Sequence, residues 1–298
     1  MHTGMPVSNP IISAVAAYEK SLQTHVQWVD CRFALSDPED GYRRYTGGHI
    51  PGAIYLSLDH DLSAPVVPGT TGRHPLPDRD AFARHIAWLG LSPQTPTIVY
   101  DAEGCPFAAR LWWMLTWLGW DSVFVLDGGW ASWQRHVPLE REQGPGRRTL
   151  PAANAFEATA ATINPASGKE SVRERAQPVQ VIDREALRQG TYRLADARAP
   201  ERFSGAQEPI DPVAGHIPGA MCTFWKDALR DDGTFRPPHE LRSYWVDRPV
   251  DICYCGSGVT ATHLILQHAI AGLTLPQLYA GSWSEWITDP DAPISLGA

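Results

Sequence analysis

Short apolar runs alternate with longer amphipathic stretches along the whole chain. The short runs are rich in β-branched and aromatic residues, which is typical of buried strands. The longer stretches carry apolar residues at helical spacing, and several of them end at a glycine, a common helix stop. This alternation predicts an α/β fold with mainly parallel sheets flanked by helices. The predicted strands cover residues 26–30, 97–100, 122–126, 192–196, 250–254 and 277–279, and the predicted helices cover residues 81–89, 108–118 and 260–271.

The two halves of the chain share a series of motifs in the same order. The sequence Gly-His-Ile-Pro-Gly-Ala occurs at residues 48–53 and again at 215–220. An Asp-x-Arg motif occurs at residues 30–32 and again at 196–198. A strand-like run and a Trp-containing segment also recur, and one difference in length between the halves explains their spacing. Repetition of this kind predicts two tandem domains of one fold.

The repeat divides the chain of 298 residues into three parts. We expect one domain at residues 1–140 and a second at residues 177–298, each of ordinary size. Residues 141–176 are rich in Gly, Pro, Ala and charged residues, so we expect a linker there. Residues that both halves keep are expected to serve the fold, and these are Arg32, His49, Arg198 and His216.

One cysteine lies directly after the predicted strand 250–254, in the loop Cys255-Gly256-Ser257-Gly258-Val259-Thr260-Ala261. The two glycines let the backbone curl so that its N–H groups point inward. The N-terminus of the following helix adds partial positive charge, which favours both a thiolate and a bound anion. Ligands of parallel sheets bind where strands end, which is where Cys255 lies. The pattern predicts a nucleophile that takes a group from an anionic donor, and the alternative is a buried cysteine on a turn.

The first half carries Asp101 at the position that corresponds to Cys255. A carboxylate cannot attack a sulfur donor and repels an anion, so we expect one catalytic centre. Cys105 is followed by a proline and lies too far along to replace the missing thiol. We expect structural roles for Cys105 and also for Cys31, Cys222 and Cys253.

Phosphoryl transfer is the main chemical alternative for a cysteine loop. Phosphatase loops end on an arginine that binds the phosphoryl oxygens through two hydrogen bonds. Here Ala261 occupies that position, which argues strongly against a phosphatase.

Composition restricts the partners. The net charge is −8 and the chain has no basic block, which argues against nucleic acid or an anionic membrane as a partner. The five cysteines match neither a disulfide framework nor a zinc site, so we expect a reducing, cytoplasmic location and no metal. No apolar run approaches the roughly 20 residues that span a membrane. No Lys or Arg precedes residues 11–17, so we expect them to form a short strand and a helix instead of a secretion signal.

Taken together, the paired Gly-His-Ile-Pro-Gly-Ala motifs, the cysteine loop and the closing Gly-Ser-Trp-Ser-Glu-Trp resemble two-domain rhodanese-family sulfurtransferases. The resemblance covers nearly the whole chain except residues 141–176, and the loop is most similar to that of 3-mercaptopyruvate sulfurtransferases. It implies that sulfur moves from 3-mercaptopyruvate or thiosulfate through a Cys255 persulfide to cyanide, a thiol or a thioredoxin-like acceptor. It implies no metal or organic cofactor. The alternatives are a thiosulfate-preferring rhodanese and a non-catalytic sulfur-relay or binding module.

The resemblance also implies roles for individual residues. Arg202 would pair with the anionic group of the donor. A relay from Asp59 through His74 to Ser257 would stabilise charge on the donor, although Asp61 is close enough to compete with Asp59. The remaining loop residues that would hold the sulfur are Gly256, Gly258, Val259 and Thr260.

Two features bear on the choice of donor. The 3-mercaptopyruvate subfamily has an additional arginine at the position held here by Ile210, which weakens the case for a carboxylate contact. The neutral pair Gly256-Ser257 lacks the basic side chains that thiosulfate-preferring members carry in the loop. These features conflict, so both donors remain candidates, with 3-mercaptopyruvate expected to be the better one.

Overall fold

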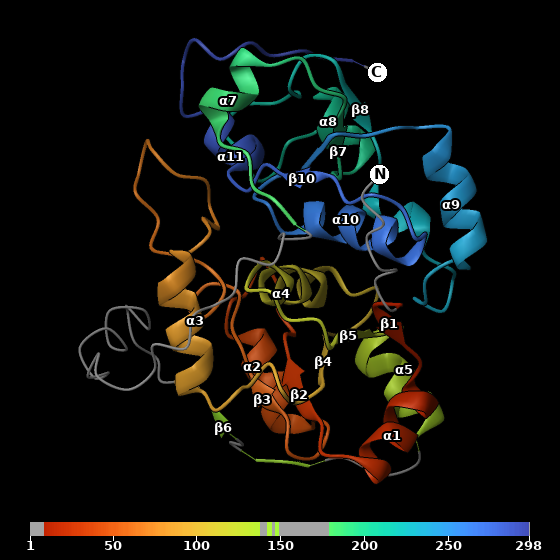
Figure 1. Ribbon diagram of the computed structural model, residues 1–298. Coiled ribbons are helices and arrows are strands. Elements are labelled where there is room, and N and C mark those ends of the chain that lie inside the picture. Colours follow the sequence, from red (N-terminus) through yellow and green to blue (C-terminus); the bar gives the residue numbers. More distant parts are fainter. Residues whose placement is uncertain (1–8, 138–141, 145–146, 149–178, 298) are drawn as a thin grey trace.

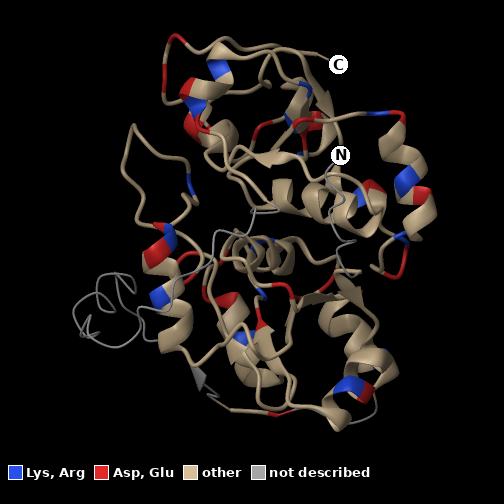
Figure 2. Cartoon of the chain, in the orientation of Figure 1, with Lys and Arg blue, Asp and Glu red and all other residues tan. Residues whose placement is uncertain are grey.

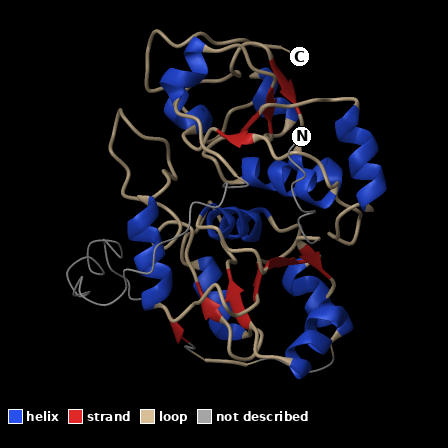
Figure 3. Ribbon diagram, viewed as in Figure 1, coloured by secondary structure: helices blue, strands red, loops and turns tan. Residues whose placement is uncertain are grey.

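The structure is a computed structural model that describes residues 9–137, 142–144, 147–148 and 179–297. Within these residues the chain forms two parallel sheets, one in each half, with helices packed against both (Figure 1, Figure 3). The predicted α/β fold with two tandem domains is confirmed. Most of the expected linker at 141–176 lies outside the described residues.

The first domain is built on a six-stranded sheet with the order β1-β5-β4-β2-β3-β6, whose strand pairings are all parallel. The strand β6 lies beyond the expected boundary at residue 140, yet it pairs with β3 and is part of this sheet. The elements in chain order are β1 (Ile11–Ile12), α1 (Ala14–Gln23), β2 (Gln27–Asp30), α2 (Asp40–Gly47), β3 (Ile54–Tyr55), α3 (Arg79–Trp88), β4 (Thr97–Tyr100), α4 (Pro106–Trp117), β5 (Val123–Leu126), α5 (Gly129–His136) and β6 (Arg147–Arg148).

The second domain is built on a four-stranded parallel sheet with the order β10-β9-β7-β8. Its central strands β7 and β9 are fully buried, as expected for a parallel sheet with both faces covered. The elements in chain order are α7 (Arg184–Gln189), β7 (Leu194–Asp196), α8 (Pro200–Ser204), β8 (Ala220–Cys222), the 3-10 helix η1 (Trp225–Ala228), α9 (Pro238–Val246), β9 (Ile252–Tyr254), α10 (Thr260–Ile270), β10 (Gln277–Leu278) and α11 (Ser282–Trp286).

Two predicted helices begin earlier than their apolar pattern suggested. The helix α3 begins at Arg79 because the side chain of Asp78 accepts a hydrogen bond from the backbone N–H of Ala81. The helix α4 begins at Pro106, and proline is favoured in the first turn because its ring presets the helical φ angle. A capping aspartate sets the first boundary and a proline in the first turn sets the second, and the apolar periodicity includes neither residue.

The two domains meet through α4 and α10, which lie beside each other at the centre of the molecule (Figure 1). Almost every residue of both helices is buried. Each helix packs with one side on its own sheet and with the other side on its counterpart, which explains why both are buried on all sides. One cluster of buried residues runs through both helices and both domains.

A buried ion pair recurs in both domains and fixes the Gly-His-Ile-Pro-Gly-Ala motifs. In the first domain Nη2 of Arg32 lies 2.6 Å from Oδ2 of Asp30 and donates to the carbonyl of Gly48 at 2.7 Å. The guanidinium also lies over the ring of Trp130, 5.0 Å from the ring centroid. The second domain repeats the three contacts with Arg198, Asp196, Gly215 and Trp283. These residues therefore hold each domain together.

Acidic and basic side chains are interspersed over the described chain (Figure 2). Among the described helices, none is both long and apolar enough to cross a bilayer.

We expect Arg32→Met to lower the free energy of unfolding by about 3–5 kcal/mol, because the carboxylate of Asp30 is left buried without its cation. Denaturant unfolding followed by circular dichroism measures this change. Arg43→Met removes an exposed pair with Asp37 and is the matched control, for which we expect a much smaller change. Equal losses in the two variants would contradict the structural role of Arg32.

Candidate active site

Cys255 follows β9 directly and precedes α10, and only 2% of its surface is exposed. The backbone N–H of Gly258 donates a hydrogen bond to its Sγ atom at 3.2 Å. Gly258 has a φ angle of +77°, and a Cβ atom there would lie 2.3 Å from the carbonyl oxygen of Ala280. A glycine is therefore required for the loop to curl around the sulfur.

The segment that follows β10 supports the cysteine loop from the other side. The hydroxyl of Ser282 accepts a hydrogen bond from the backbone N–H of Cys255 at 3.1 Å. The N–H groups of Trp283 and Ser284 donate to the carbonyls of Cys255 and Gly256 at 3.0 and 2.9 Å. These contacts explain why the closing Gly-Ser-Trp-Ser motif accompanies the cysteine loop.

Three side chains from both domains form a connected chain beside the loop. Nδ1 of His74 lies 2.7 Å from Oγ of Ser257, and Nε2 of His74 lies 3.2 Å from Oδ1 of Asp59. An ionised Asp59 can only accept a hydrogen bond, so Nε2 carries the proton and Nδ1 accepts from the hydroxyl of Ser257. Burial lowers the pKa of His74 below its usual value of 6.5, against the opposing effect of Asp59, so the ring is neutral at pH 7.

Asp61, the competing carboxylate, faces a different histidine. Its Oδ1 atom lies 2.9 Å from Nε2 of His85, and its Oδ2 atom accepts the backbone N–H of Ser57 at 2.8 Å. Asp61 is fully buried, whereas the side chain of Asp59 is 33% exposed. The structure thus brings Asp59, and not Asp61, to His74.

Two guanidinium groups lie next to Gly256 in the cysteine loop. Nη1 of Arg202 and Nη2 of Arg73 lie 3.3 and 2.9 Å from the position that a Cβ atom on Gly256 would occupy. The motifs predicted Arg202 but not Arg73, which comes from the first domain. Its place directly before His74 was the available signal.

Buried carboxylates hold these two arginines in place. Arg202 donates from Nε to Glu208 at 3.0 Å and from Nη2 to Asp211 at 2.8 Å. Nη1 of Arg73 pairs with the same Asp211. Burial lowers the pKa of Arg73, and the nearby charge of Arg202 lowers it further. Two like charges are therefore kept close together by the carboxylates between them.

Arg110 is a second residue that the motifs did not reveal. It lies in α4, is fully buried, and donates from Nη1 to the carbonyl of Gly258 at 3.0 Å. Its Nη2 atom donates to the carbonyls of Leu62 and His74 at 3.2 and 3.1 Å. A lone arginine within the apolar run of residues 108–117 was the signal that could have identified it.

The remaining predicted loop residues lie at the start of α10. Val259 is buried and precedes the helix, and Thr260 is its first residue. Ile210 lies beside the arginine cluster, which consists of Arg73 and Arg202 with their carboxylate partners. Its backbone N–H donates to Glu208 at 3.1 Å, and its side chain is 43% exposed.

In the first domain, Asp101 occupies the position that corresponds to Cys255 and binds the helix N-terminus itself. Its Oδ2 atom accepts the backbone N–H groups of Phe107 and Ala108 at 2.8 and 3.0 Å. Burial raises the pKa of Asp101 to about 7. Cys105 is fully buried and its thiol donates to the carbonyl of Leu126 at 3.2 Å. Burial raises the pKa of this thiol well above its usual value, so the thiol is protonated at pH 7.

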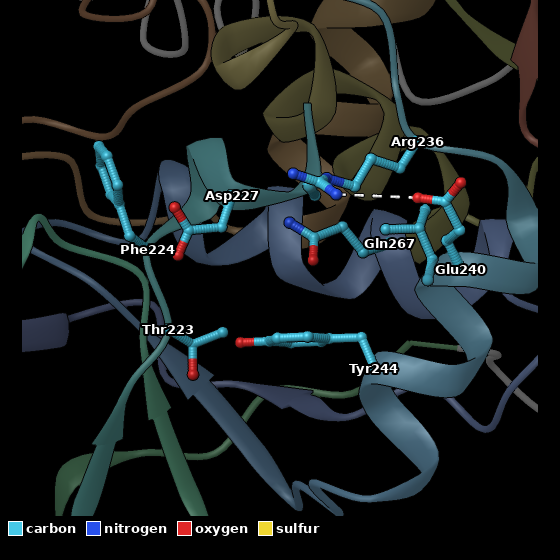
Figure 4. Close-up of a pocket in the computed structure, with 9 residues that line it drawn as sticks. Thr223, Phe224, Asp227, Arg236, Glu240, Tyr244 and Gln267 are labelled. Atoms are coloured by element: carbon cyan, nitrogen blue, oxygen red, sulfur yellow. Dashed lines mark ion pairs between the residues drawn. The ribbon is translucent and has the colours of Figure 1, made fainter. Parts of the chain in front are cut away.

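A cavity of about 340 Å³ lies between η1, α9 and α10 (Figure 4). The ion pair between Arg236 and Glu240 lies at its edge, and the hydroxyl of Tyr244 points toward Thr223. Cys255 does not line this cavity, so the cysteine loop, and not this hollow, defines the candidate site. No group of three or more side chains able to bind a metal occurs among the described residues.

Comparison with known proteins gives consistent matches over both halves. A rhodanese-like domain matches residues 13–136 and 183–289. The chain is 45% identical over 285 residues to a probable 3-mercaptopyruvate sulfurtransferase of Pseudomonas aeruginosa, covering 90% of this chain and 92% of that protein. It is 35% identical to a putative thiosulfate sulfurtransferase of Mycobacterium tuberculosis, over 91% of both chains.

Solved structures show the same similarity. The 3-mercaptopyruvate sulfurtransferase from Leishmania major matches with a TM-score of 0.74 and 29% identity, over 94% of this chain and 75% of that one. A 3-mercaptopyruvate sulfurtransferase from Escherichia coli matches with a TM-score of 0.69 and 29% identity, over 93% of this chain and 100% of that one.

We expect ring ¹⁵N NMR at pH 7 to show His74 protonated on Nε2 only, with a titration midpoint below 6.5. Asp59→Asn should lower that midpoint further, because it removes the carboxylate that favours the imidazolium. Because the folded state binds the proton less tightly than the unfolded chain, the contribution of His74 to stability is lost as the pH falls below about 6.5. Asp61→Asn is the control and should alter the signals of His85 instead. If Asp61→Asn altered the signals of His74 and Asp59→Asn did not, the pairing of Asp59 with His74 would be contradicted.

Proposed function

Because the chain belongs to the rhodanese-like family of sulfurtransferases, we propose that it moves sulfane sulfur from 3-mercaptopyruvate or thiosulfate through a persulfide on Cys255. One observation carries the proposal: the sulfur of Cys255 lies in a loop whose N–H group contacts it, with two guanidinium groups beside the same loop. Such a site combines a nucleophilic sulfur with cations for an anionic donor.

In the first half-reaction the thiolate of Cys255 attacks the sulfur of the donor. With 3-mercaptopyruvate the carbon–sulfur bond breaks, and the electron pair leaves as the enolate of pyruvate, which then takes a proton. With thiosulfate the sulfur–sulfur bond breaks and sulfite leaves. In both cases the transferred sulfur remains on Cys255 as a persulfide, supported by loop amides such as that of Gly258.

In the second half-reaction a nucleophile takes the outer sulfur. A thiolate, cyanide or a thioredoxin-like protein attacks the terminal sulfur of the persulfide, and Cys255 leaves as a thiolate. No metal or organic cofactor is required for either displacement. The five cysteines are free thiols in the structure, which supports a reducing cytoplasmic location.

The relay at Ser257 acts on donors that carry a carbonyl. In the free site its hydroxyl donates its one proton to Nδ1 of the neutral His74. When the donor is bound, the hydroxyl can turn this proton from Nδ1 to the oxygen that gains negative charge as the enolate forms. Thiosulfate forms no enolate, so the relay contributes less to its reaction.

The arginine cluster also bears on the choice of donor. Arg73 and Arg202 carry two positive charges, but Glu208 and Asp211 compensate for much of them. A nearly neutral cluster suits a monoanion better than a dianion. This supports 3-mercaptopyruvate as the better donor, whereas the resemblance to a putative thiosulfate sulfurtransferase keeps thiosulfate as the second candidate.

We expect Cys255→Ser to abolish turnover with either donor and to leave the fold intact, because the serine hydroxyl cannot replace the thiolate. Intact-mass analysis after donor treatment should show the mass of one added sulfur atom on the wild type and none on the variant. Cys105→Ser, the control in the first domain, should retain both the added sulfur and the turnover. Sulfur that stays on Cys255→Ser would contradict the assignment. A wild type that takes up no sulfur from either donor would point to a binding module instead.

We expect turnover with both donors and a higher kcat/KM with 3-mercaptopyruvate. Ser257→Ala should lower the kcat with 3-mercaptopyruvate by about 10²- to 10⁴-fold, the usual range for a lost proton-handling group. The loss with thiosulfate should be clearly smaller. Steady-state assays of pyruvate and sulfite release measure both values. If the variant loses the same factor with both donors and the wild type prefers thiosulfate, the enzyme is a thiosulfate sulfurtransferase.

A further inference from the structure

We propose that Arg110 of α4 positions the cysteine loop and serves as the counter-ion of the anionic sulfur on Cys255. The first domain would thus contribute a buried cation to a nucleophile that lies in the second domain. This role of Arg110 rests on the proposed function of Cys255 as the nucleophile. Arg110 acts through the backbone of the loop, so it is a positioning residue.

The hydrogen bonds of Arg110 connect the cysteine loop with the segment that carries His74. It donates to the carbonyl of Gly258, whose own N–H contacts the sulfur of Cys255. It also donates to the carbonyl of His74, whose ring contacts Ser257. One guanidinium therefore fixes the backbone of both the sulfur cradle and the relay.

The charge of Arg110 has no carboxylate partner in the described part of the chain. Its guanidinium donates to three carbonyl groups, and its Nε atom has no hydrogen-bond partner among the described residues. Burial lowers the pKa of Arg110 to about 10, and the negative charge of Cys255 acts against that decrease. The side chain stays charged at pH 7, and the anionic sulfur is the group that can compensate for it.

The other charged groups around Cys255 have partners of their own. Arg202 pairs with Glu208 and Asp211, and Arg73 pairs with Asp211. His74 is buried and neutral and contacts Asp59, and Arg198 pairs with Asp196. The remaining titratable side chain near the loop is the thiol of Cys253, and burial raises its pKa. Arg110 is therefore the cation in this set that lacks a carboxylate.

The position of Arg110 depends on the loop before α4. This loop corresponds to the cysteine loop of the second domain but carries Asp101 in place of the cysteine. Asp101 accepts the N–H groups of Phe107 and Ala108 and so holds the N-terminus of α4. Arg110 lies one turn further along the same helix, on the side that meets the second domain. The first domain has thus kept the loop–helix geometry of the repeat and uses it to present a cation.

The test is the pH dependence of the alkylation of Cys255 by iodoacetamide, followed at each cysteine by peptide mass spectrometry. The reagent is neutral, so it reports the thiolate and not donor binding. Arg110→Met should move the midpoint of the Cys255 profile upward by about one pH unit, as expected when a nearby cation is lost. Arg110→Lys keeps the charge but not the forked geometry, so its midpoint should lie between those of the wild type and Arg110→Met.

Two controls separate electrostatics from general damage. Cys222 is exposed and lies in β8, so its alkylation profile in the same samples should not change. Arg242→Met removes another arginine that donates to backbone carbonyls, those of Ala271 and Gly272, far along α10 from the loop. It should leave the Cys255 profile unchanged. If Arg110→Met does not fold, Arg110→Gln and Arg110→Lys provide the comparison.

Kinetics give an independent outcome. Arg110→Met should lower the kcat and leave the KM for the donor nearly unchanged, whereas Arg202→Ala should raise the KM. An unchanged Cys255 profile in folded Arg110→Met or Arg110→Gln would overturn the role of Arg110, even if stability falls. Failure of the wild type to take up sulfur on Cys255 would instead overturn the proposed function, so the two failures are distinguishable.

Discussion

The packing of α4 against α10 is the constraint on which the rest of the site depends. Both helices are buried on all sides, so neither domain can move away without exposing a continuous apolar core. This contact sets the N-terminus of α10, with the cysteine loop, against the segment of the first domain that carries His74. The nucleophile of the proposed reaction and its supporting groups therefore come from opposite sides of one buried interface.

The charge next to the cysteine loop is opposite in sign to the net charge of the chain. The net charge is −8, yet the loop is surrounded by the guanidinium groups of Arg73, Arg110 and Arg202. Two of these are tied to buried carboxylates, which fix their positions and reduce their net field. An acidic protein can in this way attract a small anion locally, because short-range contacts in a buried site are screened less than the distant surface charges.

The two domains show how one fold can be divided between chemistry and support. Each retains the same buried Arg–Asp pair and the same loop–helix connection. In the first domain the carboxyl group of Asp101 accepts the N–H groups at the start of α4. In the second domain Cys255, the nucleophile of the proposed reaction, holds the corresponding position. Under that proposal, the residue type at this position distinguishes the supporting domain from the catalytic one.

The sequence by itself determined the repeat, the α/β class and the cysteine loop, because these depend on local periodicity and on residues that are neighbours in the chain. Only the tertiary structure decided which carboxylate meets His74, since Asp59 and Asp61 are nearly equivalent in sequence and differ only in what they face. It also decided the places of Arg73 and Arg110. Arg73 pairs with Asp211 and Arg110 donates to Gly258, both in the other domain, and contacts across a domain interface leave no periodic signal in the chain.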